Sequence, residues 1–458
     1  MTVKEFFGPC DMTTGKPWEK ILIFTIPMLL GNIAQQLYST VDSIVVGNTE
    51  GVGVAGLSAI GSAMPILNML LVLFIGISAG ASIMVSQYFG AKNREKLSHS
   101  IGNCITATLI SCIVLVLVAT PFIRPVLELL NTPDTIIDDC ANYLTISLVG
   151  IAGMAFYNIL SGIIRGMGDS FSALLYLLVA TVINTVLDVW FVAGLGWGVA
   201  GVAIATVIAQ VTSSILCFIK ITKMREYVDF GLKYMRPRAS YIRTLIKLGL
   251  PSGITQAIMS SAMIVVQALT NQFGEAFIAA NIIIMRVDGF AMMPNISFGT
   301  AMSTYAGQNV GAGLYDRVTK GAKQGTIMAV GCSTVITAVI LLFGKNLMGL
   351  FTETVSLVEM SYNLMMILAV GYIAMAVTQS LSGVMRGAGD TMTPMWISLC
   401  QTIVIRVPLA YGISYLTRTP ELPYGRFECI ALSLMISWVL GAVLTAMFYR
   451  KGNWKKKA

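Results

Sequence analysis

Long apolar stretches separated by short polar connections recur along almost the whole chain. Twelve of them are long enough to cross a bilayer as helices, which takes about 20 apolar residues each. No connection is long enough to hold a separate soluble domain. The pattern predicts an all-α integral membrane protein with twelve transmembrane helices. The predicted spans are 18–43, 53–78, 99–121, 137–160, 171–193, 197–219, 245–271, 276–304, 320–343, 358–381, 392–415 and 428–449.

The second half of the chain repeats motifs of the first half. Arg165-Gly-Met-Gly-Asp169 returns 221 residues later as Arg386-Gly-Ala-Gly-Asp390, and Gln87-Tyr-Phe-Gly-Ala91 returns at the same offset as Gln308-Asn-Val-Gly-Ala312. Six spans per repeat is an even number, so both halves enter the membrane in the same direction. We therefore expect two pseudosymmetric six-helix lobes with the substrate path between them. The predicted parts are an N-terminal lobe at 1–222, a cytoplasmic interlobe linker at 223–244, and a C-terminal lobe with a basic tail at 245–458.

Composition and charge agree with a membrane protein. The 458 residues are 56% hydrophobic and 11% charged, with a mean hydropathy of +0.78. Of the 30 basic residues, 24 fall in segments that share one side with both termini, which the positive-inside rule places in the cytoplasm. This predicts a multi-pass protein of the plasma (inner) membrane, and it explains the net charge of +8 by the bilayer without a nucleic-acid partner.

The sequence lacks the signatures of an enzyme or a cofactor protein. The eight cysteines are scattered, and His99 is the single histidine, so no zinc or iron–sulfur cluster is expected. A phosphate-binding loop and a nucleophile motif are also missing. We expect no enzyme activity and no cofactor, only H⁺ or Na⁺ as a coupling ion, with a site for Na⁺ as the one metal site that the sequence allows.

Candidate chemistry lies in the ionisable residues inside spans, since an uncompensated charge there costs several kcal/mol. Asp42 ends the first span, and Asp188 lies deep in the fifth, one helical turn after Asn184. Stacked amide and carboxylate oxygens can begin a site for a hard cation such as Na⁺, to which Asn158 and Thr206 could add oxygens. A buried carboxyl could instead carry a proton. The alternative is that these groups only join helices through polar contacts.

The second half differs in charge. Arg406 corresponds to a position next to Asn184, so a cation site in the first half alone is the simplest consequence. Arg286 and Asp288 are two residues apart in the eighth span and face different directions on a helix. Asp288 is either a second acid facing a cavity or a structural partner of a basic residue elsewhere.

The repeated Arg-Gly-x-Gly-Asp motifs predict sharp turns between the fourth and fifth and between the tenth and eleventh spans. Glycine permits the turn, arginine can reach the last carbonyl groups of the preceding helix, and aspartate can cap the next helix. The residues assigned to this structural role are Arg165, Gly166, Asp169, Arg386, Gly387 and Asp390.

A substrate cavity is suggested by methionine and amide side chains on spans expected to flank the interlobe path. Flexible methionine walls suit varied amphipathic cations, although any one methionine can simply pack between helices. The assigned cavity residues are Gln35, Tyr38, Met259, Gln267, Asp288 and Met292.

Together these motifs resemble the multidrug and toxic compound extrusion (MATE) family. The resemblance rests on the proline-containing first span that ends in Ser39-Thr-Val-Asp42, the paired Gln-x-x-Gly-Ala and Arg-Gly-x-Gly-Asp motifs, and Asn184-x-x-x-Asp188. It also includes Gly194-Leu-Gly-Trp-Gly-Val-Ala-Gly201 and Arg406-Val-Pro-Leu-Ala-Tyr411. The order of the motifs across both halves makes the resemblance specific, and it covers the whole chain.

The resemblance implies a V-shaped bundle of two six-helix lobes that exports small organic, often cationic compounds in exchange for H⁺ or Na⁺. We expect the protein to be a monomer. The family's cation site carries over to Asp42, Asn158, Asn184, Asp188 and Thr206. Some members also use acids in the seventh and tenth spans, but this chain has Met259, Thr378 and Gln379 near those places. The alternatives are a flippase for lipid-linked oligosaccharides, which should carry more basic residues in its cleft, and a channel or receptor.

Overall fold

The computed structural model describes residues 8–48, 53–130, 132–452 and 454–457, and the secondary structure of these residues consists of helices alone. Ten of the described helices are long and apolar enough to cross a membrane, and the bent pair α6 (Ile137–Val149) and α7 (Ile151–Gly166) makes an eleventh span. The first predicted span falls in α2 (Pro17–Asn48), whose side chains after Gln36 lie outside the described residues. Every predicted span coincides with a helix or a run of helices, which confirms the all-α membrane fold.

The chain forms two compact units. Unit 1 comprises Met1–Asp11 and Ile26–Gly253, and unit 2 comprises Met12–Thr25 and Ile254–Ala458. This division differs from the predicted lobes in two places. The start of α2 belongs to unit 2, and the start of α11 (Ala239–Thr270) belongs to unit 1.

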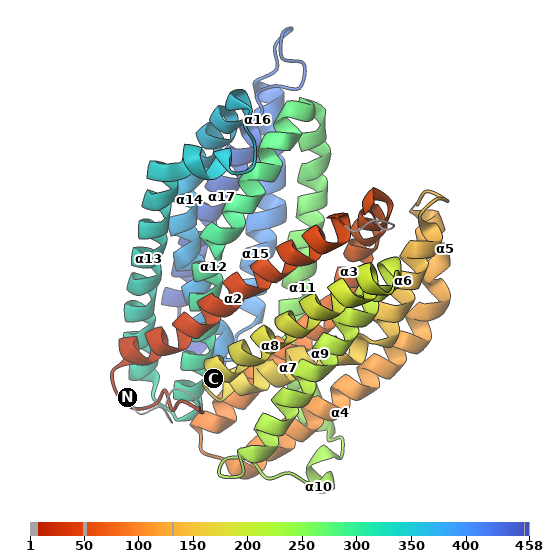
Figure 1. The fold of residues 1–458 in the computed structure, drawn as a ribbon. Coiled ribbons are helices and arrows are strands. Elements are labelled where there is room, and N and C mark those ends of the chain that lie inside the picture. Colours follow the sequence, from red (N-terminus) through yellow and green to blue (C-terminus); the bar gives the residue numbers. More distant parts are fainter. Residues whose placement is uncertain (1–7, 49–52, 131, 453, 458) are drawn as a thin grey trace. The chain divides into compact units, whose positions relative to one another are not determined.

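In unit 1, the bent α6–α7 span contacts both α3 and α9 (Figure 1). A 3-10 turn, η1, joins α4 to α5, and a π-helical segment, η2, extends α8. Besides α6, α7 and parts of α2 and α11, the helices of unit 1 are α3 (Gly53–Gly90), α4 (Arg94–Ala119), η1 (Thr120–Phe122), α5 (Ile123–Leu129), α8 (Ser170–Asp188), η2 (Val189–Gly194), α9 (Gly198–Lys223) and α10 (Leu232–Met235).

In unit 2, α14 takes the corresponding central place and contacts α12, α13 and α17. A second π-helical segment, η4, lies inside the eleventh predicted span, so both repeats carry a π segment in their fifth span. Besides parts of α2 and α11, the helices of unit 2 are η3 (Asn271–Phe273), α12 (Glu275–Gly311), α13 (Tyr315–Gly349), α14 (Val355–Gly387), α15 (Met392–Leu399), η4 (Cys400–Arg406), α16 (Val407–Leu416), α17 (Cys429–Arg450) and α18 (Trp454–Lys457).

Close backbone packing explains why the start of α11 belongs to unit 1. Gly76 and Gly80 of α3 face Gly249 of α11, and a Cβ added at Gly80 would lie 2.7 Å from the carbonyl oxygen of Leu245. A Cβ at Gly76 would lie 3.0 Å from the Gly249 oxygen and 3.2 Å from the Cα of Gly253. Small residues four apart allow this approach, which is a common way for membrane helices to associate. Both helices have the spacing Gly-x-x-x-Gly at this crossing.

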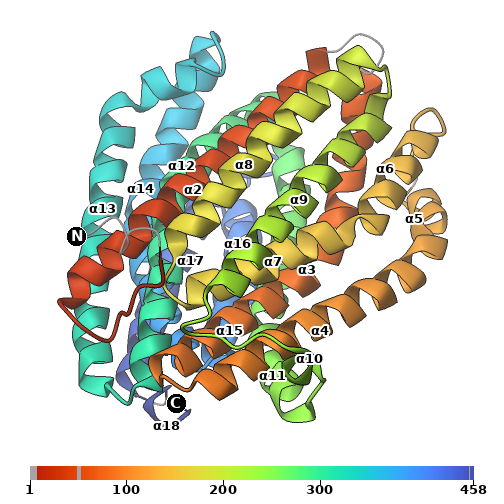
Figure 2. The same cartoon turned by 60° about the horizontal axis from the view of Figure 1, so that its bottom comes forward.

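The predicted interlobe linker is attached to unit 1. Its segment between α9 and α11 runs along the first turns of α4, where the short helix α10 also packs (Figure 2). Arg94 of α4 forms a 2.6 Å ion pair with Asp229, and the Asp229 N–H donates to Ser98. The buried Asn103 accepts a 2.7 Å hydrogen bond from the N–H of Arg238. The linker is therefore held on α4 along most of its length.

Candidate functional site

The candidate cation site lies on a pair of antiparallel helices, α8 and α9, which run side by side (Figure 1). Two hydrogen bonds between them fix their register. Ser213 of α9 donates to the carbonyl oxygen of Tyr176 at 2.7 Å, and farther along α8 the amide of Asn184 donates to the hydroxyl of Thr206 at 3.3 Å. This register brings Asn184 and Thr206 together, as a shared site requires.

The turn before α8 sets where this helix begins. Gly168 has a φ of 88°, a conformation that favours glycine. Asp169 caps α8 by accepting hydrogen bonds from the Ser172 N–H at 2.9 Å and the Ser172 hydroxyl at 2.7 Å. The same carboxylate lies 3.3 Å from the Lys220 ammonium at the end of α9. Through Asp169, the turn therefore joins the start of α8 to the end of α9.

The second repeat builds the same turn. Gly389 has a φ of 93°, and Asp390 accepts from the Thr393 N–H at 3.3 Å and from its hydroxyl at 2.7 Å. Arg165 and Arg386 lie in the last turns of α7 and α14. The glycine after each arginine packs against a neighbouring backbone: Gly166 contacts the carbonyl of Ser82, and Gly387 contacts that of Ser303.

Asp188 and Asn184 are both buried inside unit 1. Asp188 is 1% exposed and Asn184 is fully buried, and they lie one helical turn apart on α8. Asp188 is the last residue of α8, and the helix continues as the π segment η2. Single π turns inside helices often occur at functional sites, because they redirect side chains and loosen the regular hydrogen bonding.

The remaining predicted ligands differ in how the structure places them. The side chain of Asp42 lies outside the described residues. The Asn158 amide on α7 donates to the Met154 carbonyl of its own helix at 2.8 Å, so this hydrogen bond does not join it to α8. Within the described residues, the structure therefore brings together Asn184 and Thr206, with Asp188 one turn away.

Sequence reasoning overlooked Gln210 on α9. It lies one turn after Thr206, and its Oε1 atom is buried and accepts no hydrogen bond from any described residue. The same is true of the Oδ1 atom of Asn184. Buried amide oxygens of this kind are rare unless water or an ion satisfies them. The spacing Thr206-x-x-x-Gln210 inside an apolar span was the signal that could have found it.

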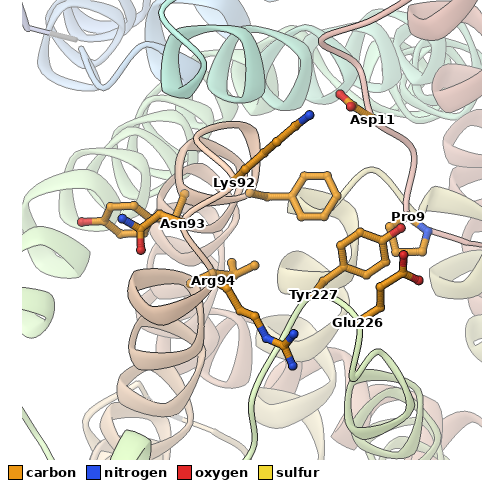
Figure 3. A pocket seen from close by; sticks show the side chains of 10 residues that line it. Pro9, Asp11, Lys92, Asn93, Arg94, Glu226 and Tyr227 are labelled. Carbon is orange, nitrogen blue, oxygen red and sulfur yellow. The ribbon is translucent and has the colours of Figure 1, made fainter.

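A separate pocket of about 440 Å³ lies at the helix ends of unit 1 (Figure 3). Side chains of both charges surround Tyr227 there, including Lys92, Asp11 and Glu226. Burial raises the pKa of Tyr227, and the charges of Glu226 and Asp11 add to this shift, so its hydroxyl stays neutral near pH 7. None of the predicted cation ligands lines this pocket.

The structure also resolves the surroundings of Asp288. This residue of α12 interacts with the hydroxyl of Tyr372 on α14 and with the charge of Arg406 in η4. Its carboxylate therefore faces a basic residue elsewhere, which was one of the two alternatives. Arg286, two residues earlier on α12, is exposed.

The predicted cavity residues are divided between the units. Gln35 belongs to unit 1, Met259 and Gln267 belong to unit 2, and the side chain of Tyr38 lies outside the described residues. Gln267 is exposed and donates a 2.8 Å hydrogen bond to Asn271 of the following turn. Met292 packs against the core of unit 2, which agrees with the simpler packing role. A shared cavity for these residues stays a prediction.

The fold and its buried polar groups define a class of protein. Two helical units with matching turns, a π segment in the fifth span of each and polar side chains inside the spans are the architecture of a duplicated membrane transporter. The chain is thus an integral membrane protein with polar side chains buried inside its spans.

Comparison with known proteins identifies the family. A family model described as MatE matches residues 27–190 and, a second time, residues 251–412. The chain belongs to the MatE family of multidrug and toxic compound extrusion transporters, as its motifs predicted. The double match also confirms the internal repeat.

Similar proteins cover nearly the whole chain. The probable multidrug resistance protein YoeA of Bacillus subtilis (strain 168) is 29% identical over 449 residues, which are 96% of this chain and 95% of that protein. The probable multidrug resistance protein NorM of Thermotoga maritima is 22% identical over 453 residues, covering 96% of this chain and 94% of NorM.

Solved structures share the fold. A structure of a MATE protein in complex with MaL6 has a TM-score of 0.90 at 23% identity, covering 99% of this chain and all of that one. A transporter of the MOP superfamily from Pyrococcus furiosus has a TM-score of 0.87 at 23% identity and covers 98% of both chains.

Proposed function

We propose that the chain is a secondary active exporter of small organic compounds, lipophilic and often cationic, that antiports H⁺ or Na⁺ by alternating access. It acts as a monomer in the plasma (inner) membrane with both termini in the cytoplasm, an orientation that the distribution of basic residues favours. The observation that carries the proposal is the burial of Asp188 one turn from the Asn184–Thr206 pair. The names of the relatives, probable multidrug resistance proteins, support the substrate class.

The chemistry of the site suits a small cation. A carboxylate inside a membrane span costs several kcal/mol unless it is neutralised, and either a proton or Na⁺ would neutralise Asp188. Na⁺ needs several oxygen ligands, and the Oδ1 of Asn184 and the Oε1 of Gln210 accept no hydrogen bond within the described residues. A proton needs only the carboxylate. Binding of Na⁺ therefore requires the oxygen of Asn184, whereas binding of a proton does not.

Coupling follows from competition for one charge. A cation gradient loads Asp188 from outside and favours one orientation of the transporter, whereas a cationic substrate binds from the cytoplasm after the ion has left. Each ligand shifts the conformational equilibrium only by its difference in affinity between the two states. Because the linkage is reciprocal, the coupling ion weakens substrate binding by the same factor by which the substrate weakens ion binding.

The test is efflux of a fluorescent lipophilic cation from cells that lack their own pumps, under either an imposed Na⁺ gradient or an imposed pH gradient. Asp188→Asn should lower gradient-driven efflux about 10-fold or more, because it removes the charge through which the ligands compete. Asp139→Asn is the matched control, since this aspartate lies in the first turn of α6 and is exposed. It should transport like the native chain.

Asn184→Ala distinguishes the two ions. It should abolish Na⁺-driven efflux if Na⁺ is the coupling ion and leave pH-driven efflux largely intact if H⁺ is. Normal transport by Asp188→Asn would refute the proposed site. Absence of efflux from a well-expressed native chain would refute the proposed substrate class and favour lipid-linked cargo.

A further inference from the structure

The two repeats place opposite charges within one helical turn of each other in their fifth spans. At the repeat offset of 221 residues, Arg406 corresponds to Thr185, the neighbour of Asn184. Both positions lie in the fifth span of their repeat: Arg406 ends the π segment η4, and Thr185 lies in α8, three residues before Asp188. Unit 2 therefore carries a fixed positive charge where unit 1 carries its candidate cation ligands.

The acid and the hydroxyl near Arg406 are also specific to unit 2. By the same offset, Asp288 corresponds to Leu67 and Tyr372 to Ile151. Leu67 is 2% exposed and Ile151 is fully buried, and both belong to the hydrophobic core of unit 1. In unit 2, Asp288 thus interacts with both Tyr372 and Arg406, whereas the counterparts of Asp288 and Tyr372 in unit 1 are apolar.

Tyr372 is held firmly in place on one side of Asp288. Tyr372 is 1% exposed, and its carbonyl oxygen accepts hydrogen bonds from Asn295 at 3.1 Å and Ser333 at 3.0 Å. Its hydroxyl donates to the sulfur of Met365 at 2.7 Å and lies near the carboxylate of Asp288. Tyr372 therefore forms a rigid wall beside Asp288.

On the side of Arg406, the polar atoms around Asp288 are incompletely paired. Asp288 and Arg406 interact through their charges but form no direct ion pair among the described residues. The Oδ1 atom of Asp288 and the Nε atom of Arg406 are buried, and neither has a hydrogen-bond partner in the described part of the chain. Arginine stays charged under all ordinary conditions, so its guanidinium offsets the carboxylate without an ion from solution.

We propose that Asp288 is a second cation-binding carboxylate, that the tethered guanidinium of Arg406 takes the place of the cation, and that this excludes H⁺ and Na⁺ from unit 2. The proposal rests on the proposed ion-coupled function, because it explains why only one half of a duplicated chain would couple. Removing Arg406 leaves a buried carboxylate whose Oδ1 atom accepts no hydrogen bond in the described part of the chain, and a proton or Na⁺ then becomes the means of neutralising it. Tyr372 and Arg406 are the ionisable groups that interact with Asp288 from α14 and η4, and Arg286 on its own helix is exposed.

The experiment measures equilibrium binding of Na⁺, and uptake of protons on acidification, by the purified full-length protein. Arg406→Gln should bind about one more cation per chain than the native protein, because the vacated carboxylate recruits it. Arg406→Lys should bind the native number, since it keeps a tethered charge. The double variant Asp288→Asn/Arg406→Gln should also bind the native number. Arg286→Gln is the matched control on α12 and should bind the native number.

The inference is overturned if Arg406→Gln binds the same number of cations as the native protein, or if the double variant keeps the additional cation. If Arg406→Gln does not fold, Arg406→Met takes its place: an additional cation in this variant supports the inference, and the native number overturns it. An additional cation in Arg406→Lys or in the double variant also contradicts the inference. The readout is a difference from the native chain. A native protein that binds no cation at Asp188 would therefore count against the proposed function without affecting this test.

Discussion

The glycine crossing between α3 and α11 predicts a position-dependent effect of one substitution, Gly→Ala. At Gly80 the added Cβ would lie 2.7 Å from the Leu245 oxygen and 2.8 Å from the Gly249 nitrogen. These are backbone atoms that cannot rotate away, so the helices must separate by about 0.8 Å to restore ordinary contact. Overpacking of this kind costs about 1–3 kcal/mol. At Gly61 of the same helix, nothing lies within 4 Å of the added Cβ.

The comparison isolates packing, because both variants gain the same intrinsic helix preference of about 0.5–1 kcal/mol for alanine over glycine. We expect Gly61→Ala to unfold at or above the native temperature and Gly80→Ala to unfold below it. In a unit of this size, about 1 kcal/mol corresponds to roughly 2–4 °C in Tm, so the gap between the variants should be at least a few degrees. Gly76→Ala, at 3.0 Å from the Gly249 oxygen, should fall between them.

The assay is thermal unfolding of each purified variant in the same detergent. Unfolding is monitored by intrinsic fluorescence and by the fraction of protein that stays in the monodisperse peak in size-exclusion chromatography after heating. Equal Tm values for Gly61→Ala and Gly80→Ala would refute the close approach of the two backbones. A lower Tm for Gly61→Ala than for Gly80→Ala would contradict it outright.

Three further predictions concern unit 1. Asn103→Ala should cost about 1–3 kcal/mol, because it leaves a linker N–H without its acceptor, and should speed proteolysis of the linker, whereas the exposed Asn142→Ala should not. Asp169→Ala should lower Tm by the loss of a helix cap worth about 0.5–2 kcal/mol, while Asp169→Asn keeps a capping side chain and loses only the charge facing Lys220. Gln210→Leu should leave Tm unchanged or raised, since it removes a buried oxygen without a partner, yet it should slow Na⁺-driven efflux if that oxygen binds the ion.

Hydropathy was sufficient to predict the spans because each transmembrane helix must be apolar over its own length. The bend between Val149 and Ile151 and the π segments were not predicted. They depend on packing between helices and leave no local apolar signal. The turn residues were recognisable because the φ of 88° at Gly168 and the helix cap at Asp169 depend only on residues that are close in sequence.

The polar sites were predictable only in part, because contacts within one helix follow from the sequence and contacts between helices do not. Asn184 and Asp188 could be paired from sequence because they lie one turn apart on one helix. The approach of Tyr372 to Asp288 could not, because it joins residues 84 positions apart on different helices, and a tyrosine in an apolar span has many ordinary roles. The docking of the linker on Asn103 was missed because a single asparagine near a helix start gives no sign of its partner.

The difference between the repeats is better explained by charge than by shape. Both halves keep the same turns and the same central span, so the duplication preserved the backbone geometry of these parts. If geometry alone made a coupling site, unit 2 would have one as well. A carboxylate within hydrocarbon needs a compensating positive charge, and that charge can come from solution or from the chain itself. Asp188 has oxygen-bearing neighbours that suit an ion from solution, whereas Asp288 faces Arg406. One substitution at position 406 should therefore be enough to change how many ions the protein binds.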